Sequence, residues 1–126
     1  MNYILTIFKA LSDQNRLRIF TALMNHKKLC GCQIIELLQI TGATVSRHMD
    51  SLLSAALVTS NKEGRWVFYK LNKEKIYPPL LDWILQNVAE DEIYQKDRER
   101  LREITAYKPE ELCRIQRGEK CCPTKK

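Results

Sequence analysis

The sequence predicts a mostly α-helical domain with one small β-hairpin, and three observations support this fold class. Apolar residues recur at helical spacing in five stretches of the chain. Two of these stretches are joined by a tight turn that contains Gly42, which is the helix-turn-helix pattern. Directly after them, two β-rich runs flank a short turn with Gly64, as in a hairpin. We therefore expect a winged helix-turn-helix.

Two helices are predicted before the polar segment 25–28. One face of the first carries the apolar residues Ile4, Leu5, Ile7, Phe8 and Leu11. Ser12 and Asp13 can cap the second helix, because short side chains with an oxygen accept hydrogen bonds from a helix start. The inward stripe of this second helix is Leu17, Phe20, Leu23 and Met24.

The predicted helix-turn-helix consists of a short helix over residues 32–39 and a helix that follows Thr41 and extends to about residue 56. With Val45, Met49, Leu52 and Leu53 turned inward, the second of these helices has a polar outer face. Short hydrogen-bonding groups, a guanidinium and an imidazole suit base edges and phosphates in a major groove. We therefore predict that DNA is bound by Thr41, Thr44, Ser46, Arg47, His48 and Ser51.

The predicted hairpin has strands at residues 57–61 and 65–71 and a turn at residues 62–64. Lys62 and Arg65 lie at its tip, where we expect them to contact phosphates or an adjacent minor groove. Alternatively, both residues belong to an ordinary solvent-exposed turn that does not contact DNA.

A final long helix is predicted from Pro78 and Pro79, apolar as far as Val88 and highly charged over residues 90–103. The first and last helices together carry more apolar surface than a winged core needs. We therefore expect a homodimer that pairs through these two helices. The predicted division of the chain is a DNA-binding and dimerisation domain over residues 1–106 and a cysteine-containing tail over residues 107–126.

Length and composition narrow the class of protein. A chain of 126 residues is long enough for one domain with a substantial core. No run approaches the roughly 18 apolar residues of a membrane helix, and the first residues lack the pattern of a secretory signal. We expect a cytoplasmic protein, in which its five cysteines are reduced thiols. The net charge of +6 supports an anionic partner.

Cys30, Gly31 and Cys32 form the motif with the most distinctive chemistry, because they stand at the start of the helix that supports the DNA-binding helix. Residues two apart on a regular helix point about 200° apart. One small ligand could hold both thiols only if the helix start unwinds, which glycine makes easier. We therefore expect a switch in which a bound ligand distorts the support of the DNA-binding helix.

Five segments resemble the ArsR/SmtB family of winged-helix metal-sensing repressors. Residues 8–13 and 16–19 are similar to its opening signature, residues 45–49 to its DNA-reading helix and residues 64–69 to its wing. Residues 29–32 match the metal-binding box of its arsenite and cadmium/lead branches. The resemblance implies a homodimer that binds an inverted-repeat operator without a cofactor. It also implies that a metal or metalloid releases the DNA and derepresses a resistance operon.

Departures from the family pattern reduce the number of candidate ligands. Gly42 and Ala43 stand where the family usually has Gln and Pro, and Gln33 replaces a common acidic residue. Ile35 occupies the position of a third cysteine in some arsenite sensors. Residues 80–104 contain no histidine, so the zinc and nickel/cobalt site of other branches is not expected. Cadmium/lead sensors would carry cysteines before residue 30, and none is present.

The predicted inducer is As(III) or Sb(III), held by sulfur alone. Thiolates favour soft centres over oxygen-loving cations, and As(III) takes three of them. Cys30 and Cys32 supply two, and we expect the third from Cys121 or Cys122 in the tail. Cys113 is a weaker candidate.

Two alternative functions use the same fold. One is a repressor that responds to Cd(II) or Pb(II), and the other is a thiol redox switch in which a disulfide replaces the metal. An enzyme is not expected, because the chain has no Gly-rich phosphate loop, no C-x-x-C near a βαβ unit and no paired acid/base cluster.

Overall fold

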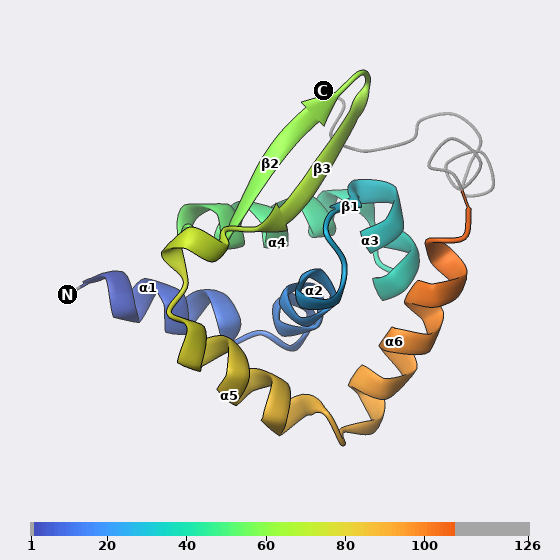
Figure 1. The fold of residues 1–126 in the computed structure, drawn as a ribbon. Helices are drawn as coiled ribbons and strands as arrows, with labels where there is room; N and C mark the ends of the chain where they lie inside the picture. Colours follow the sequence, from blue (N-terminus) through green and yellow to red (C-terminus); the bar gives the residue numbers. More distant parts are fainter. Residues whose placement is uncertain (1, 108–126) are drawn as a thin grey trace.

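The computed structural model describes residues 2–107 and confirms the predicted fold class (Figure 1). Its elements are α1 (Asn2–Leu11), α2 (Gln14–Asn25), β1 (Leu29–Cys30), α3 (Gly31–Leu38), α4 (Gly42–Ser54), β2 (Val58–Glu63), β3 (Trp66–Leu71), the 3-10 turn η1 (Lys73–Lys75), α5 (Pro78–Val88) and α6 (Glu92–Ile104). No helix in this part of the chain is long and apolar enough to cross a membrane.

Helix α2 lies at the centre of the molecule, with the other helices arranged around it (Figure 1). Its residues Ile19 and Phe20 are completely buried, and Leu23 is nearly so. Burial of an aliphatic or aromatic side chain of this size contributes about 1.5–3 kcal/mol. Phe20 and Leu23 of the predicted stripe therefore lie at the centre of the core with Ile19, which the prediction did not include, whereas Leu17 and Met24 are half-buried.

Two predicted helix caps are confirmed by hydrogen bonds. Asp13 Oδ2 accepts from the backbone N–H groups of Asn15 and Arg16, at 2.9 and 3.2 Å. Thr41 Oγ1 accepts from the backbone N–H of Thr44 at 3.2 Å. Each bond satisfies a donor that has no partner within its own helix, and so fixes where α2 and α4 begin.

The sheet contains a strand that the sequence analysis missed. It is antiparallel with the order β1-β3-β2, and Leu29 and Cys30 pair with Tyr69 and Phe68 of β3. Cys30 therefore ends a strand and is also the N-cap of α3, so its predicted place at the start of this helix is confirmed. A strand of two residues is too short for a periodic sequence pattern, so only its partner strand reveals it.

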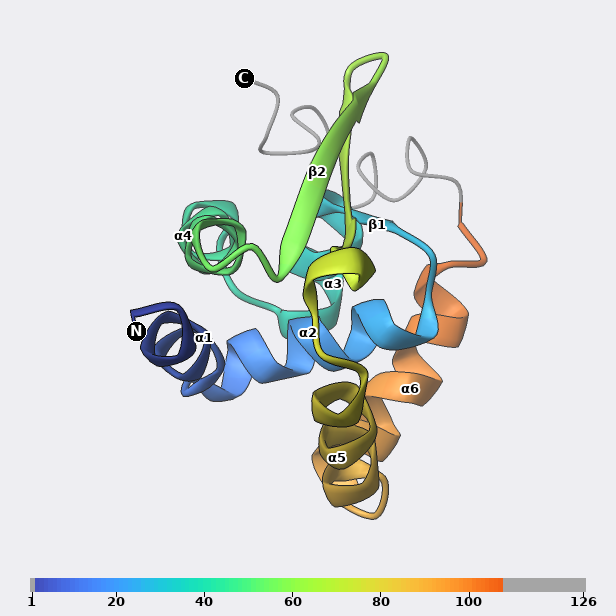
Figure 2. The ribbon, with the colours of Figure 1, turned by 60° about the vertical axis from the view of Figure 1, so that its left-hand side comes forward.

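The hairpin formed by residues 58–71, which we call the wing, projects away from the helices (Figure 2). Its β2 strand continues through Lys62 and Glu63, which were predicted in the turn. The turn consists of Gly64 and Arg65, and Gly64 has a φ of +66°, a conformation that glycine adopts without a steric penalty. The turn is therefore shorter than predicted.

The predicted final long helix is two helices. α5 ends at Val88, and Asp91 starts α6 by accepting a hydrogen bond from the Ile93 backbone N–H at 3.0 Å. α6 then packs against α2 and α3, and three residues of its charged sequence are buried: Asp97, Leu101 and Ile104. The expectation of a single helix was wrong because these residues gain partners in α2 and α3.

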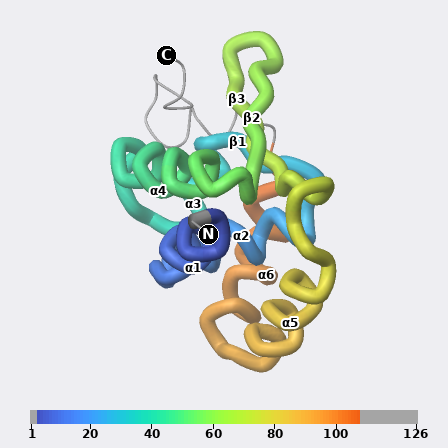
Figure 3. Tube along the Cα trace, turned by 90° about the vertical axis from the view of Figure 1, so that its left-hand side faces the viewer, coloured from blue at the N-terminus to red at the C-terminus, as the bar shows by residue number. Residues whose placement is uncertain are grey.

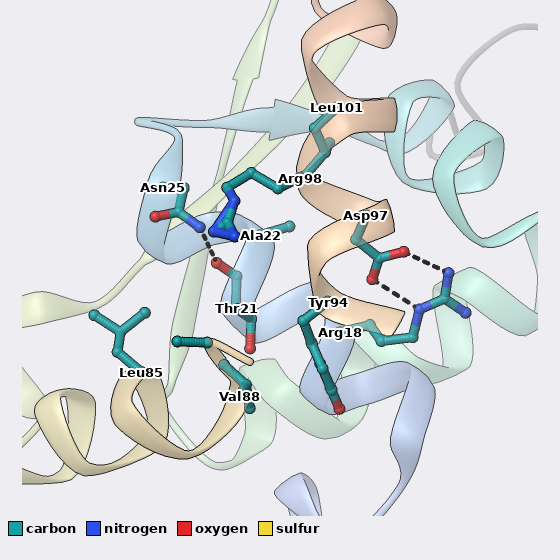
Figure 4. Close-up of a pocket in the computed structure, with 11 residues that line it drawn as sticks. Arg18, Thr21, Ala22, Asn25, Leu85, Val88, Tyr94, Asp97, Arg98 and Leu101 are labelled. Atoms are coloured by element: carbon teal, nitrogen blue, oxygen red, sulfur yellow. Dashed lines mark hydrogen bonds and ion pairs between the residues drawn. The ribbon is translucent and has the colours of Figure 1, made fainter. Parts of the chain in front are cut away.

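An ion pair holds α6 on α2. Arg18 Nε and Nη2 donate to the two carboxylate oxygens of Asp97, at 2.9 and 2.8 Å, beside a small cavity between α2, α5 and α6 (Figure 4). Asp97 raises the pKa of Arg18, mainly through this hydrogen bond. Arg100 extends the contact to α3, because its Nη2 donates to the Glu36 carbonyl at 2.8 Å.

Candidate nucleic-acid interface and thiol pair

Helix α4 presents a polar row on its solvent side. Arg47 and Thr41 are exposed, whereas Thr44, Ser46 and Ser51 are half-buried. The hydroxyls of Thr41 and Thr44 are 2.9 Å apart, and Arg47 Nη2 lies 3.5 Å from the Thr44 hydroxyl oxygen. The opposite face of α4 is fixed in the core by Val45, Met49 and Leu52. The row is therefore a set of hydrogen-bonding groups on a rigid helix.

His48 lies apart from this row, although the sequence analysis placed it on the same outer face. Its side chain is 13% exposed. Nδ1 lies 3.3 Å from Nη1 of Arg16, and Nε2 lies 3.9 Å from Oδ2 of Asp13. A helical wheel anticipates this, because position 48 is only about 60° from buried Val45. His48 therefore packs α4 against the start of α2.

The partners of His48 indicate its protonation state. Arginine only donates hydrogen bonds, so His48 Nδ1 accepts from Arg16 and carries no proton. Burial lowers the pKa of His48, with Asp13 opposing and the cations of Arg16 and Arg47 reinforcing this effect. The neutral ring thus belongs to a junction of three helices, because Arg16 Nε also donates to the Ala10 carbonyl in α1 at 2.7 Å.

The wing carries its two predicted basic residues on exposed positions. Lys62 lies in β2 opposite Val67, and Arg65 lies in the turn with its guanidinium carbon 5.6 Å from the centre of the Trp66 ring. A cation over an aromatic face is held by the charge distribution of the ring. Trp66 therefore restricts the positions of Arg65, a role that the sequence analysis did not assign.

Cys30 and Cys32 are close in sequence and both completely buried. Cys30 lies at the N-terminal boundary of α3, and its backbone N–H donates to Gln33 Oε1 at 2.8 Å. Gln33, one of the departures from the family pattern, thus supports the motif by closing the first turn of α3. Because neither sulfur is open to solvent, a ligand that binds both must first open this region.

The third predicted thiolate remains a prediction. Within residues 2–107, no group of three or more Cys, His, Asp or Glu side chains is arranged to hold a metal ion. Cys113, Cys121 and Cys122 lie outside the residues that the structure describes. Of the two described cysteines, Cys30 carries a thiol, whereas Cys32 is disulfide-bonded.

Helices α1 and α5, whose Cα traces are drawn in Figure 3, both carry exposed large apolar side chains, and α5 is the first half of the predicted final helix. Phe8 and Trp83 are about 60% exposed. The Tyr3 hydroxyl of α1 donates to the Lys75 carbonyl in η1, the element before α5, at 3.1 Å. The other exposed apolar residues here are Tyr3, Ile4, Leu5, Tyr77 and Leu85.

Comparisons with known proteins point to one family. Residues 13–60 match the model of the bacterial regulatory proteins of the arsR family. The chain is 42% identical over 83 residues to the arsenical resistance operon repressor of Staphylococcus xylosus, an alignment that covers 66% of this chain and 74% of that protein.

Two further relatives match over 69 residues, which is 55% of this chain. The arsenical resistance operon repressor of Bacillus subtilis is 41% identical over 66% of its length, and the cadmium resistance regulatory protein CadC of Listeria innocua is 42% identical over 58%. The chain thus spans less than two thirds of the length of these two relatives.

Solved structures support the fold. HlyU from Vibrio cholerae has a TM-score of 0.63 at 22% identity, over 70% of this chain and 94% of that chain. The homodimeric winged helix-turn-helix DNA-binding domain of Mb0332 from Mycobacterium bovis has a TM-score of 0.61 at 23% identity, over 75% and 84%.

Proposed function

Because the chain belongs to the arsR family of bacterial regulatory proteins, we propose that it is a transcriptional repressor that leaves its operator when As(III) or Sb(III) binds. The observation that carries the DNA-binding part is the row of Thr41, Thr44 and Arg47 on the solvent side of a helix whose other face is fixed in the core. The proposal includes no catalytic step.

In this proposal α4 lies in the major groove. Arg47 contacts base edges, and the hydroxyls of Thr44, Ser46 and Ser51 contact bases or phosphates, with Thr41 beside them. Lys62 and Arg65 of the wing add phosphate or minor-groove contacts. His48 does not contact the DNA in this proposal, and it acts indirectly by holding α4 against Asp13 and Arg16.

The active form is proposed to be a homodimer that binds an inverted repeat. The exposed apolar side chains of α1 and α5 form a surface that a second copy would bury. Trp83→Ala, which removes a large exposed side chain of α5, should shift the sedimentation coefficient toward the monomer. Tyr107→Ala, at an exposed aromatic residue away from these helices, is the control. A Trp83→Ala protein that sediments as the wild type would contradict this interface.

As(III) or Sb(III) is proposed to bind the thiolates of Cys30 and Cys32, with Cys121 or Cys122 as the third. Arsenical resistance repressors among the relatives support this ligand, and soft centres prefer sulfur. Since Cys30 and Cys32 are both buried and Cys32 is disulfide-bonded, binding requires the reduced protein and favours a form in which β1 and the start of α3 have opened. DNA must then weaken ligand binding by the same factor, and such couplings are about 1–3 kcal/mol.

A cadmium-responsive repressor is the second candidate, because a cadmium resistance regulatory protein is equally similar over 69 residues. Cd(II) is also thiophilic. Titration with both ions under reducing conditions separates the two, and a response to neither but to an oxidant would indicate a redox switch.

The decisive experiment uses a DNA duplex that the full chain itself selects from random sequence. Fluorescence anisotropy should show release of this duplex by arsenite under reducing conditions. Cys30→Ser and Cys32→Ser should bind the duplex normally and lose the release. Cys30→Ala and Cys32→Ala repeat the test without a buried hydroxyl.

Two further variants test the third thiolate. Truncation after Arg117, which removes Cys121 and Cys122, should lower arsenite affinity, whereas Cys113→Ser should not. If the Cys30 and Cys32 variants release DNA at the arsenite concentration of the wild type, the proposed sensor is wrong.

A further inference from the structure

The wing has little support from the core near its tip. β1 pairs with β3 only at Tyr69 and Phe68, whereas β2 and β3 continue together to the pair Glu63 and Trp66. The outer part of the wing is therefore a two-stranded ribbon, which is marginally ordered by itself. Any contact between this ribbon and the core affects where the tip lies.

Lys28 makes such a contact from the segment between α2 and β1. Its Nζ lies 2.8 and 2.6 Å from the two carboxylate oxygens of Glu63, the last residue of β2. The same Nζ lies 4.4 Å from the centre of the Phe68 ring. Asn61 Nδ2 also donates to Glu63, at 3.3 Å. Lys28 thus spans from the core to the residue that precedes the turn.

We propose that Lys28 is a positioning residue for DNA binding, which braces the wing through Glu63 and Phe68 so that Arg65 reaches the DNA. Glu63 faces Trp66 across the ladder, and Arg65 lies over the Trp66 ring. The brace therefore acts at the base of the turn that carries Arg65. Neither Lys28 nor Glu63 has to touch DNA for this role.

The brace differs from two simpler roles. The side chains of Lys28 and Glu63 are 45% and 41% exposed, and exposed ion pairs contribute little to the free energy of unfolding. A purely structural pair would therefore leave DNA binding unchanged. A purely electrostatic role predicts that loss of the Glu63 carboxylate strengthens binding to phosphates, whereas the brace predicts weaker binding.

The same brace connects the wing to Cys30, an extension that rests on the proposed function. Lys28 is two residues before Cys30, and the Cys30 backbone pairs with Phe68 beneath the Lys28 ammonium. A ligand that opens β1 therefore moves Lys28 and frees the wing. The signal would reach DNA through the wing as well as through α4.

The test compares matched variants of the full chain for affinity to the selected duplex. Glu63→Gln should bind roughly twofold to fivefold more weakly, while Glu74→Gln, an exposed acid of η1, should not. Lys28→Met should lose more affinity than Lys27→Met, which removes the same charge one residue away. The reversed pair Lys28→Glu with Glu63→Lys should recover affinity relative to Lys28→Glu alone.

Amide hydrogen exchange of residues 58–71 provides a readout without DNA. Glu63→Gln should exchange faster there than the wild type and equally over residues 42–54. If Glu63→Gln binds as tightly as the wild type, or Lys28→Met equals Lys27→Met, the brace is overturned.

Arsenite added to the wild type should also speed exchange over residues 58–71. Arsenite that releases DNA without this change overturns only the connection to Cys30. A failure of arsenite to release DNA concerns the proposed function and leaves the tests of the brace in the free protein valid.

Discussion

The two helices of the helix-turn-helix differ sharply in burial. In α3, six of eight residues are buried, including Cys32, whereas α4 buries only Val45, Met49 and Leu52 of its thirteen. α3 is thus part of the core, and α4 is a surface element attached by one stripe. A change in α3 must act through the packing of the molecule, whereas α4 can change its outer side chains without disturbing the fold.

The connection between the helices makes this division useful for a switch. Gln39 ends α3 in a left-handed conformation, with φ 57° and ψ 44°, and its N–H donates to the Ile35 carbonyl at 2.8 Å. The next helix begins after Thr41. Because the connection is short, a displacement of α3 displaces α4 as well.

The largest effect is expected from Leu37→Ala in α3. Leu37 is 2% exposed, and removal of such a side chain leaves a cavity that costs about 2–5 kcal/mol. Urea unfolding at constant protein concentration measures it, with Ser54→Ala on the exposed side of α4 as the control. A Leu37→Ala protein as stable as the control would show that α3 is not part of the core.

Arg47→Ala in α4 should weaken DNA binding and leave the free energy of unfolding almost unchanged, in contrast to Leu37→Ala. Loss of a guanidinium that reads base edges costs about 1–3 kcal/mol of operator binding and relaxes sequence preference. The free energy of unfolding should stay within about 0.5 kcal/mol of the wild type, as for most exposed sites. Anisotropy with specific and random duplexes measures the binding, and unchanged sequence preference would show that α4 is not the reader.

His48→Ala should give a smaller, mixed effect. It removes the contact with Arg16 and part of the packing of α4 on α2, which we expect to cost about 1 kcal/mol of stability. Operator affinity should fall less than for Arg47→Ala. If His48→Ala loses as much sequence preference as Arg47→Ala and keeps the stability of the wild type, His48 contacts the DNA directly.

The smallest expected effect is a dependence of stability on pH. The pKa of His48 is lowered from 6.5 mainly by burial, so the unfolded chain binds its proton more readily. This contribution to stability is present above about pH 6.5 and is lost as the pH falls through the lower folded pKa. Urea unfolding between pH 7 and 5 should therefore show falling stability, with a shallower fall in His48→Gln.

His26 offers an independent check on this sign, because burial lowers its pKa as well. His26→Gln should also make the fall shallower. A stability that rises from pH 7 to 5 in the wild type and not in the two variants would contradict the directions of both shifts.

The sequence by itself determined the features that depend on neighbouring residues. The apolar stripes of α2 and α4, the caps Asp13 and Thr41 and the turn glycine Gly64 were all predicted and are present. So was the outward position of Arg47. Helical periodicity and capping act over a few residues, and therefore a local pattern is sufficient to reveal them.

Tertiary structure decided the features whose partners lie far away in the chain. Asp97 is buried against Arg18, 79 residues distant, and this contact folds α6 back on the core. His48 turns inward to Arg16 over 32 residues, and Lys28 reaches Glu63 over 35. In each case the hydrogen-bonding partner of a charged or polar side chain lies in a distant element, and no local pattern identifies that partner.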